Sequence, residues 1–148
     1  MSTNERLPPA PVLSFAELEA LVRDCAYHVW LGVRLVSLDA AGVVIEMPWR
    51  EEFVSDTQGR YTHGGILASL IDLSADYAIA AQLGRGVPTA DLRVDYHRPA
   101  FPGRLVARAK VLKLGSALAS AEAHVFDENN NLVASGRGAF LTLARPAQ

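Results

Sequence analysis

The segment that most constrains the fold is a long apolar stretch near the middle of the chain, YTHGGILASLIDLSADYAIA, residues 61–80. Apolar side chains recur around almost the whole circumference of a helix in this segment, so we expect a helix to about Leu83 that a sheet wraps nearly all round. Gly84-Arg85-Gly86 and then Pro88 end this helix.

One stripe of the expected helix is different. Gly65, Ser69, Asp72 and Asp76 are separated by four, three and four residues and therefore share a face. This stripe either faces water, as in an ordinary amphipathic helix, or faces a ligand. Asp76 lies one turn after Asp72, and two carboxylates so close together can raise the pKa of one of them.

The residues at the start of the stripe favour the interpretation that the stripe faces a ligand. His63-Gly64-Gly65 stands at the expected helix start, where backbone N–H groups lack intrahelical partners and the helix dipole is positive. Glycines there let another molecule approach the amides closely, as an oxyanion site requires. The alternative is simple capping, with Thr62 as the N-cap and the glycines serving packing.

The rest of the chain predicts one α+β domain with an antiparallel sheet. Ser14 and Glu17 form a capping-box pattern, which predicts a helix to about Tyr27. A hairpin should follow, then an irregular, exposed segment, and after the long helix a meander of four strands. The hairpin strands are residues 31–38 and 43–49, the irregular segment is 50–62, and the last three strands are 105–112, 117–126 and 132–143. Residues 1–13, with three prolines, are expected to form a flexible N-terminal tail before a domain spanning 14–148.

Composition excludes several functions. The 148 residues carry a formal charge of −2, without the basic run of a nucleic-acid binder. The apolar run from Gly64 to Ile71 is far short of the roughly 20 residues that span a bilayer. Cys25 is the single cysteine, so no intrachain disulfide forms, and the cytoplasm is the expected compartment. We expect no metal and no cofactor, no nucleic acid and no membrane.

The sequence resembles the hotdog-fold acyl-CoA thioesterases of the phenylacetate-degradation (PaaI-like) branch. The resemblance covers roughly residues 29–143 and rests on His63-Gly64-Gly65 with Asp72 nine residues after the histidine, on DLRVDYHRPA at 91–100 and on LVASG at 132–136. It implies a long central helix wrapped by a curved antiparallel β-sheet, here with an extra N-terminal helix. It also implies a dimer whose sheets join edge to edge, and hydrolysis of a thioester to free acid and CoA.

The resemblance also implies roles for individual residues. Asp72 falls on the catalytic carboxylate, as nucleophile or general base, and Gly65 falls on the oxyanion amide. His63 and Asp76 fall on positions that line the site, and Gly64 and Ser69 are candidate substrate contacts. Six residues before the histidine, where this branch often has Asn or Gln, the chain has Thr57. Gln58, one place later, is the candidate for that amide.

Coenzyme A carries phosphates, so basic residues near the motif are candidates for binding it. Arg60 lies beside the motif, and a basic group follows the long helix: Arg85, Arg93, Arg98, Arg104, Arg108, Lys110 and Lys113.

A dimer follows from helix geometry as well. Gly65 and Asp72 are seven residues apart, about 10.5 Å along a helix, so one thioester carbonyl cannot meet both in one chain. The site is therefore expected to pair Gly65 of one subunit with Asp72 of another, in a homodimer or a homotetramer built as a dimer of dimers.

Two other functions fit the sequence less well. One is a non-catalytic acyl-CoA-binding hotdog protein. The other is a hotdog dehydratase, suggested by HRPAFPG at 97–103. In dehydratases such a loop should precede the central helix, whereas here it follows the helix, and its prolines are explained as turn formers.

Overall fold

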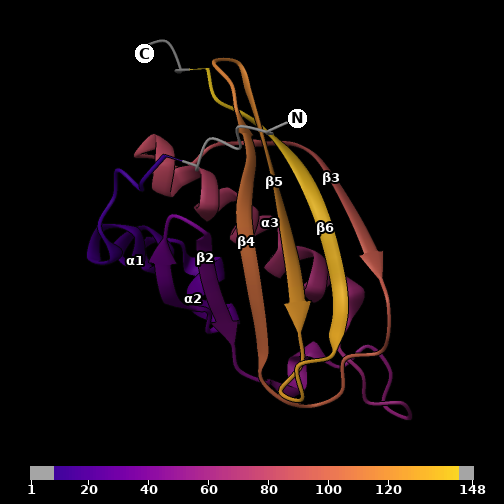
Figure 1. Cartoon of the computed structure of the whole chain (residues 1–148). Helices are drawn as coiled ribbons and strands as arrows, with labels where there is room; N and C mark the ends of the chain where they lie inside the picture. Colours follow the sequence, from indigo (N-terminus) through magenta and orange to yellow (C-terminus); the bar gives the residue numbers. More distant parts are fainter. Residues whose placement is uncertain (1–8, 144–148) are drawn as a thin grey trace.

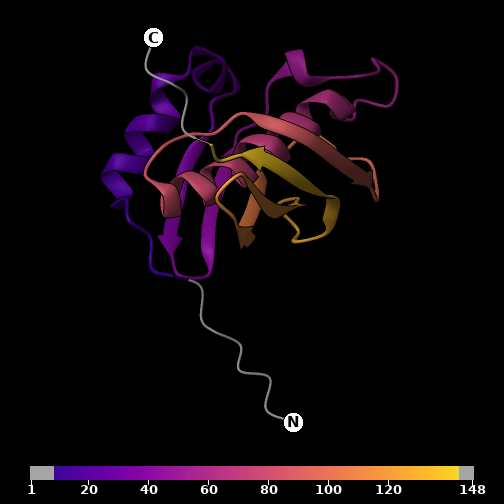
Figure 2. The ribbon, with the colours of Figure 1, turned by 90° about the horizontal axis from the view of Figure 1, so that it is seen from above.

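A long helix lies against a curved antiparallel sheet of six strands (Figure 1). The structure is a computed structural model and describes residues 9–143. The helix is α3, Gly64–Leu83. The strands are β1 (Arg34–Asp39), β2 (Gly42–Met47), β3 (Thr89–Tyr96), β4 (Leu105–Leu114), β5 (Leu118–Phe126) and β6 (Leu132–Leu141). Seen from above, the sheet curves around α3 (Figure 2), which confirms the predicted hotdog fold.

The apolar side chains of α3 build the core, as its sequence predicts. Leu70, Ile71 and Ile79 are fully buried, and the sheet strands face them with small residues such as Ala107, Ala121 and Ala123. In the described part of the chain, α3 is also the one helix with the length and hydropathy to cross a bilayer. Most of its apolar window is buried inside the fold, so α3 is the core helix of this domain.

The strand order differs from the expected meander. The sheet runs β1-β2-β4-β5-β6-β3, so β4, β5 and β6 form a three-strand meander while β3 pairs with β6 at the far edge. The β1–β2 hairpin occupies the side of β4 that a meander would give to β3. Alternation of apolar residues identifies a strand but not its neighbours, which is why the prediction of a four-strand meander was wrong.

The N-terminal region forms two helices instead of the predicted one. Helix α1, Phe15–Asp24, has the expected capping box, but the chain becomes extended at Cys25. A second helix, α2 (Ala26–Leu31), follows and ends at Gly32 with φ of 76°. Leu31 thus belongs to α2 rather than to the first strand.

Part of the expected tail contacts α3. The amides of Val12 and Leu13 both donate to the carbonyl of Ala81, at 2.8 and 3.2 Å. Residues 1–8 lie outside the described residues, so the boundary between a flexible tail and the domain stays a prediction.

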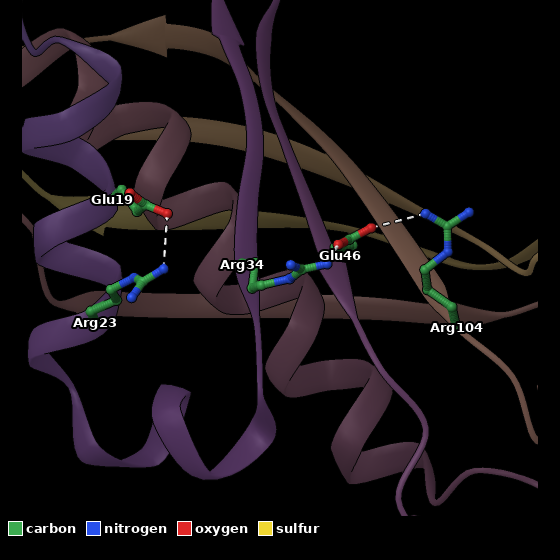
Figure 3. Close-up of polar contacts among 5 residues, drawn as sticks. All are labelled: Glu19, Arg23, Arg34, Glu46 and Arg104. Carbon is green, nitrogen blue, oxygen red and sulfur yellow. Dashed lines mark hydrogen bonds and ion pairs between the residues drawn. The ribbon is translucent and has the colours of Figure 1, made fainter.

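Ion pairs fix the hairpin on the sheet (Figure 3). The Glu46 carboxylate accepts from Arg34 of β1 and from Arg104, 2.9 Å away, at the start of β4. Hydrogen bonds from Arg104 and Arg34 hold the pKa of Glu46 below its ordinary value. The same figure shows Arg23 paired with Glu19 one turn earlier on α1. Arg104, one of the candidate phosphate ligands, is therefore engaged in the sheet.

Candidate active site

The segment before α3 is anchored by a buried side chain. Phe53 closes a short 3-10 turn, Glu51–Phe53, and is 1% exposed. Its carbonyl accepts the His63 amide at 2.7 Å, and Val54 forms an antiparallel bridge with Thr62. Most of 50–62 is exposed as expected, but Phe53 and Thr62 are buried and pack inward at the start of α3.

His63, and not Thr62, is the N-cap of α3. The His63 Nδ1 accepts the Gly65 N–H at 2.8 Å. Thr62 is buried, and its Oγ1 has no hydrogen-bond partner among the described residues. Gly65 is exposed. The amide that the resemblance assigns to an oxyanion is thus at the surface, held by the neighbouring imidazole.

Gly64 faces a hollow on the β3 side of the helix start. The Tyr96 hydroxyl, at the end of β3, donates to the Gly64 carbonyl at 2.9 Å, and a Cβ on Gly64 would lie 3.3 Å from the Tyr96 ring. The hollow has a volume of about 410 Å³ and combines aromatic rings with basic side chains. Its lining includes Tyr61, Gly64, Leu67, Tyr96, His97 and Arg98.

The predicted stripe exists and is the less buried face of α3. Ser69, Asp72 and Asp76 are all half-buried, between the fully buried turns of the helix. Asp72 Oδ1 accepts a hydrogen bond from the Thr89 hydroxyl at 2.8 Å, at the first residue of β3. This bond fixes the carboxylate and leaves Oδ2 without a partner among the described residues.

Ser69 links the stripe to α2. Its hydroxyl donates to the Gly65 carbonyl at 2.9 Å and lies 2.8 Å from the Tyr27 hydroxyl. A serine hydroxyl has one proton, so Tyr27 is the donor in the second bond.

Asp76 has an unusual electrostatic environment. Its pKa is raised from 3.8 to about 6, chiefly by burial and to a lesser degree by the charge of Asp72, against the opposing effect of the Val87 N–H, which donates to Asp76 Oδ1 at 3.0 Å. The expected coupling of the two acids is therefore present, but burial is the larger cause. Asp76 also ties the turn after α3 back to the helix.

Two predicted substrate contacts are engaged elsewhere. Both Glu51 carboxylate oxygens lie 2.8 Å from Arg60 Nη2. Gln58 lies in an exposed turn closed by Asp56, which accepts its backbone N–H at 2.9 Å. Neither side chain contacts the stripe, whereas His63, Gly64, Gly65, Ser69, Asp72 and Asp76 all belong to α3 or its cap.

Sequence reasoning missed the residues that reach this stripe from other elements. Thr89 follows Pro88 without any motif of its own, and Tyr27, 46% exposed, lies at the end of the predicted first helix without a motif either. Tyr96 belongs to the segment 91–100 on which the resemblance rests, but the alternation of apolar residues there predicted only a strand and no contact for Tyr96. No local pattern identified these contacts.

The arrangement offers an amide donor and a carboxylate, with no group of metal-ligating side chains among residues 9–143. Because α3 is continuous from Gly64 to Leu83, Gly65 and Asp72 stay about 10.5 Å apart along its axis. One chain alone does not bring them to a single reacting carbon.

A long central helix wrapped by a curved antiparallel sheet defines the class of fold, a hotdog domain. The sequence model of the thioesterase superfamily matches residues 59–134, about half of the chain. The chain belongs to the thioesterase superfamily.

Solved structures and a relative found by sequence agree with this assignment. A crystal structure of another thioesterase-superfamily protein is 43% identical, covers 86% of this chain and 96% of its own, and superimposes with a TM-score of 0.85. The Escherichia coli PaaI protein of the phenylacetic acid degradation operon has the same fold, with a TM-score of 0.79, 24% identity and coverage of 88% and 96%. A medium/long-chain acyl-CoA thioesterase of Salmonella typhimurium is 24% identical, with 83% of this chain and 89% of that protein covered. The predicted resemblance to hotdog-fold thioesterases is confirmed.

Proposed function

We propose that this protein hydrolyses acyl-CoA thioesters, with the Gly65 amide as oxyanion donor and Asp72 as the reacting carboxylate. One observation carries the proposal: the less buried face of an otherwise buried helix begins at the exposed Gly65, whose N–H donates to His63, and carries a carboxylate oriented by Thr89. The relative in Salmonella typhimurium acts on acyl-CoA thioesters, which supports the same substrate class here.

The thioester oxygen would accept the Gly65 N–H in place of His63 Nδ1. The positive end of the α3 dipole would then stabilise the charge that develops on this oxygen. His63, released from the amide, is placed to contact the substrate. A single oxyanion-hole donor of this kind contributes about 10²-fold to 10³-fold in rate.

Asp72 would act in one of two ways. As general base, its free Oδ2 takes a proton from water while the water oxygen bonds to the carbonyl carbon; the tetrahedral intermediate then expels CoA thiolate, which takes up the proton. As nucleophile, Oδ2 forms a mixed anhydride and expels the thiolate, and water then hydrolyses the anhydride. In both cases the Thr89 hydroxyl keeps Oδ1 in place.

Two subunits would complete the site. β3 is the last strand of the sheet and pairs on one side only, with β6. If two β3 edges pair antiparallel across a two-fold axis, the Thr89 end of one strand lies beside the Tyr96 end of the other. This places the Asp72 region of one subunit next to the Gly65 region of its partner. The homodimer suffices for this geometry, and a dimer of dimers would keep it.

The hollow beside Gly64 would hold the coenzyme. Arg98 and His97 supply cationic or hydrogen-bonding groups there, and Tyr61 and Tyr96 supply aromatic faces. Of the candidate phosphate ligands, Arg98 is the one that lines this hollow. Arg85 donates to the Thr142 carbonyl at 2.7 Å and is engaged in the fold.

The cytoplasm is the proposed compartment, because Cys25 is a free thiol and coenzyme A is the proposed substrate.

Thiol release from a panel of acyl-CoAs tests the proposal. The wild type should release free CoA, and Asp72→Asn should lower kcat by at least about 10²-fold while the circular dichroism spectrum stays unchanged. Binding without turnover would indicate a non-catalytic acyl-CoA-binding protein. Formation of an enoyl product without free thiol would indicate a dehydratase.

A further inference from the structure

The first turns of α3 lie between two surfaces of different chemistry. On the Gly64 face is the hollow that contains His97 and Arg98. Ser69 is five residues later, about 140° further around the helix, and contacts α2. There α2 presents Tyr27 and Trp30, whose rings stack with centroids 6.1 Å apart and planes inclined by 12°.

We define Tyr27 and Trp30 as the aromatic shelf. Trp30 packs edge-on against the buried Phe53, with ring centroids 5.7 Å apart, and the Phe53 carbonyl holds the His63 amide. At the other end, Tyr27 donates to Ser69, one turn before Asp72. The shelf is therefore linked at one end, through Phe53, to the segment that caps α3, and at the other end to Ser69 of the stripe.

The shelf is held rigidly although it is not buried. The Tyr27 hydroxyl is fixed by Ser69, and His28, between the two rings in sequence, lies 2.9 Å from the Tyr77 hydroxyl. The Arg50 guanidinium lies over Trp30, 5.3 Å from the ring centroid. Yet Tyr27 and Trp30 remain 46% and 41% exposed, side by side. Two immobilised aromatic rings that stay partly exposed are suited to bind an apolar group.

We propose that the aromatic shelf receives the acyl group of the substrate, so that Tyr27 and Trp30 determine which acyl chains are accepted. The inference rests on the proposed function, which places the thioester oxygen at the Gly65 amide. The sulfur and the acyl carbon leave the carbonyl carbon in directions about 120° apart, as for any trigonal carbon. The coenzyme carries phosphates and belongs on the side of Arg98, which leaves the acyl chain on the side of α2.

The alternative occupant is a second copy of the chain. A shelf that served only as an interface would not distinguish one acyl chain from another. The bond from Tyr27 to Ser69 and the link of Trp30 through Phe53 to the α3 cap favour the acyl group, because they connect the shelf to the stripe and to the segment before Gly65.

Binding of non-hydrolysable S-alkyl-CoA thioethers tests the inference without requiring turnover. Calorimetry with methyl, hexyl and decyl thioethers gives the dependence of Kd on chain length. Trp30→Ala and Tyr27→Ala should each weaken decyl binding by about 10-fold and methyl binding by less than about 2-fold, since the methyl group is too short to cover the shelf. Tyr27→Phe keeps the ring and should keep most of the chain-length dependence.

Two further variants serve as controls. Phe15→Ala removes a side chain of matched exposure, 42%, from α1 and should change none of the three Kd values. Arg98→Ala should weaken all three alike, because it acts on the coenzyme.

Each outcome either supports or overturns the inference that the aromatic shelf receives the acyl group. Equal losses for all three thioethers in the shelf variants, no loss in any, or no thioether binding to the wild type would overturn the inference. A change confined to the oligomeric state in size-exclusion chromatography would instead identify the shelf as an interface and also overturn it. Chain-length-dependent binding that the shelf variants abolish, in a wild type that releases no thiol, would support the shelf and reject the proposed hydrolysis.

Discussion

At the scale of single residues, the stripe of α3 contains two acids in different environments. Asp72 accepts from a side-chain hydroxyl, that of Thr89, whereas Asp76 accepts from a backbone amide, that of Val87. Burial raises the pKa of Asp76 to about 6. Asp72 is thus the acid that a hydrogen bond orients while one oxygen stays free. Asp76 is the acid whose charged form is disfavoured by burial.

The Thr89–Asp72 hydrogen bond gives the first prediction. Thr89→Val keeps the shape of the side chain but removes the donor, and a hydrogen bond to a charged group is worth about 1.5–3 kcal/mol. We expect kcat to fall by about 10-fold or more, with the melting temperature little changed because Thr89 is exposed. Thr89→Ser restores a hydroxyl and should recover most of the rate. Steady-state thiol release measures both, and a Val variant with wild-type kcat would remove Thr89 from the mechanism.

The raised pKa of Asp76 predicts a pH dependence of stability. Since its pKa is 3.8 in the unfolded reference and about 6 in the fold, the folded protein binds the proton more tightly. The contribution of Asp76 to the free energy of unfolding therefore falls as pH rises from about 4 to about 6. Asp76→Asn keeps an acceptor for the Val87 amide and cannot ionise. At pH 7.5 it should be more stable than the wild type, by on the order of 2 kcal/mol, and the two should converge near pH 4. Urea unfolding at both pH values checks this, and a difference independent of pH would contradict it.

At the scale of elements, the sheet packs closely against α3, and this packing positions the stripe of α3 relative to β3. A Cβ on Gly136 of β6 would lie 2.6 Å from the Arg93 carbonyl of β3 and 2.7 Å from Ile71 Cγ2 of α3. The absence of a side chain at Gly136 lets three elements meet at one point. Ile71 precedes Asp72, so this contact also determines how far the carboxylate stands from β3.

Gly136→Ala is therefore expected to strain β3, β6 and α3 together. Overpacking of this kind typically lowers the free energy of unfolding by about 1–3 kcal/mol. Because the added Cβ would clash with backbone, which moves less easily than a side chain, we expect a loss of about 2 kcal/mol or more. Gly86→Ala is the matched control, because the nearest atom to its added Cβ is 3.8 Å away. Thermal unfolding of both variants provides the comparison. Similar melting temperatures for the two variants would show that the sheet adjusts at Gly136 without cost.

At the scale of the whole molecule, the proposed site is divided between subunits. α3 is a continuous helix of 20 residues, so Gly65 and Asp72 cannot approach each other within a chain. In the proposed dimer, a second copy would bring the missing group through the free edge of β3.

Mixed dimers test this division. Gly65→Pro removes the amide proton in the first turn, where the N–H has no intrahelical acceptor, so the helix should persist. Dimers of Gly65→Pro alone or of Asp72→Ala alone should be nearly inactive. A dimer with one chain of each has one site with both lesions and one with neither, so activity should return toward half of wild type. If purified, folded heterodimers stay inactive, then the two residues do not form a site in trans.

Much of the fold could be predicted because it depends on local patterns. The apolar circumference of 64–83 required a wrapped helix, Gly84 ended it, and the spacing of Gly65, Ser69, Asp72 and Asp76 fixed them on one face. The capping box at Ser14 and the turn at 39–42 were equally local. These features follow from covalent geometry and helical periodicity, which neighbouring elements do not alter.

Only the tertiary structure decided which groups meet across the chain. The position of β3 beside β6 and the contacts of Tyr27 and Thr89 with the stripe depend on packing between distant segments. Alternation of apolar residues predicts a strand but not the strand it pairs with. A threonine in the sequence likewise does not indicate which carboxylate its hydroxyl will contact. The sequence by itself thus determined the helix and the order of its polar groups, whereas packing decided what surrounds them, because contacts between distant residues form only when the whole sheet closes on the helix.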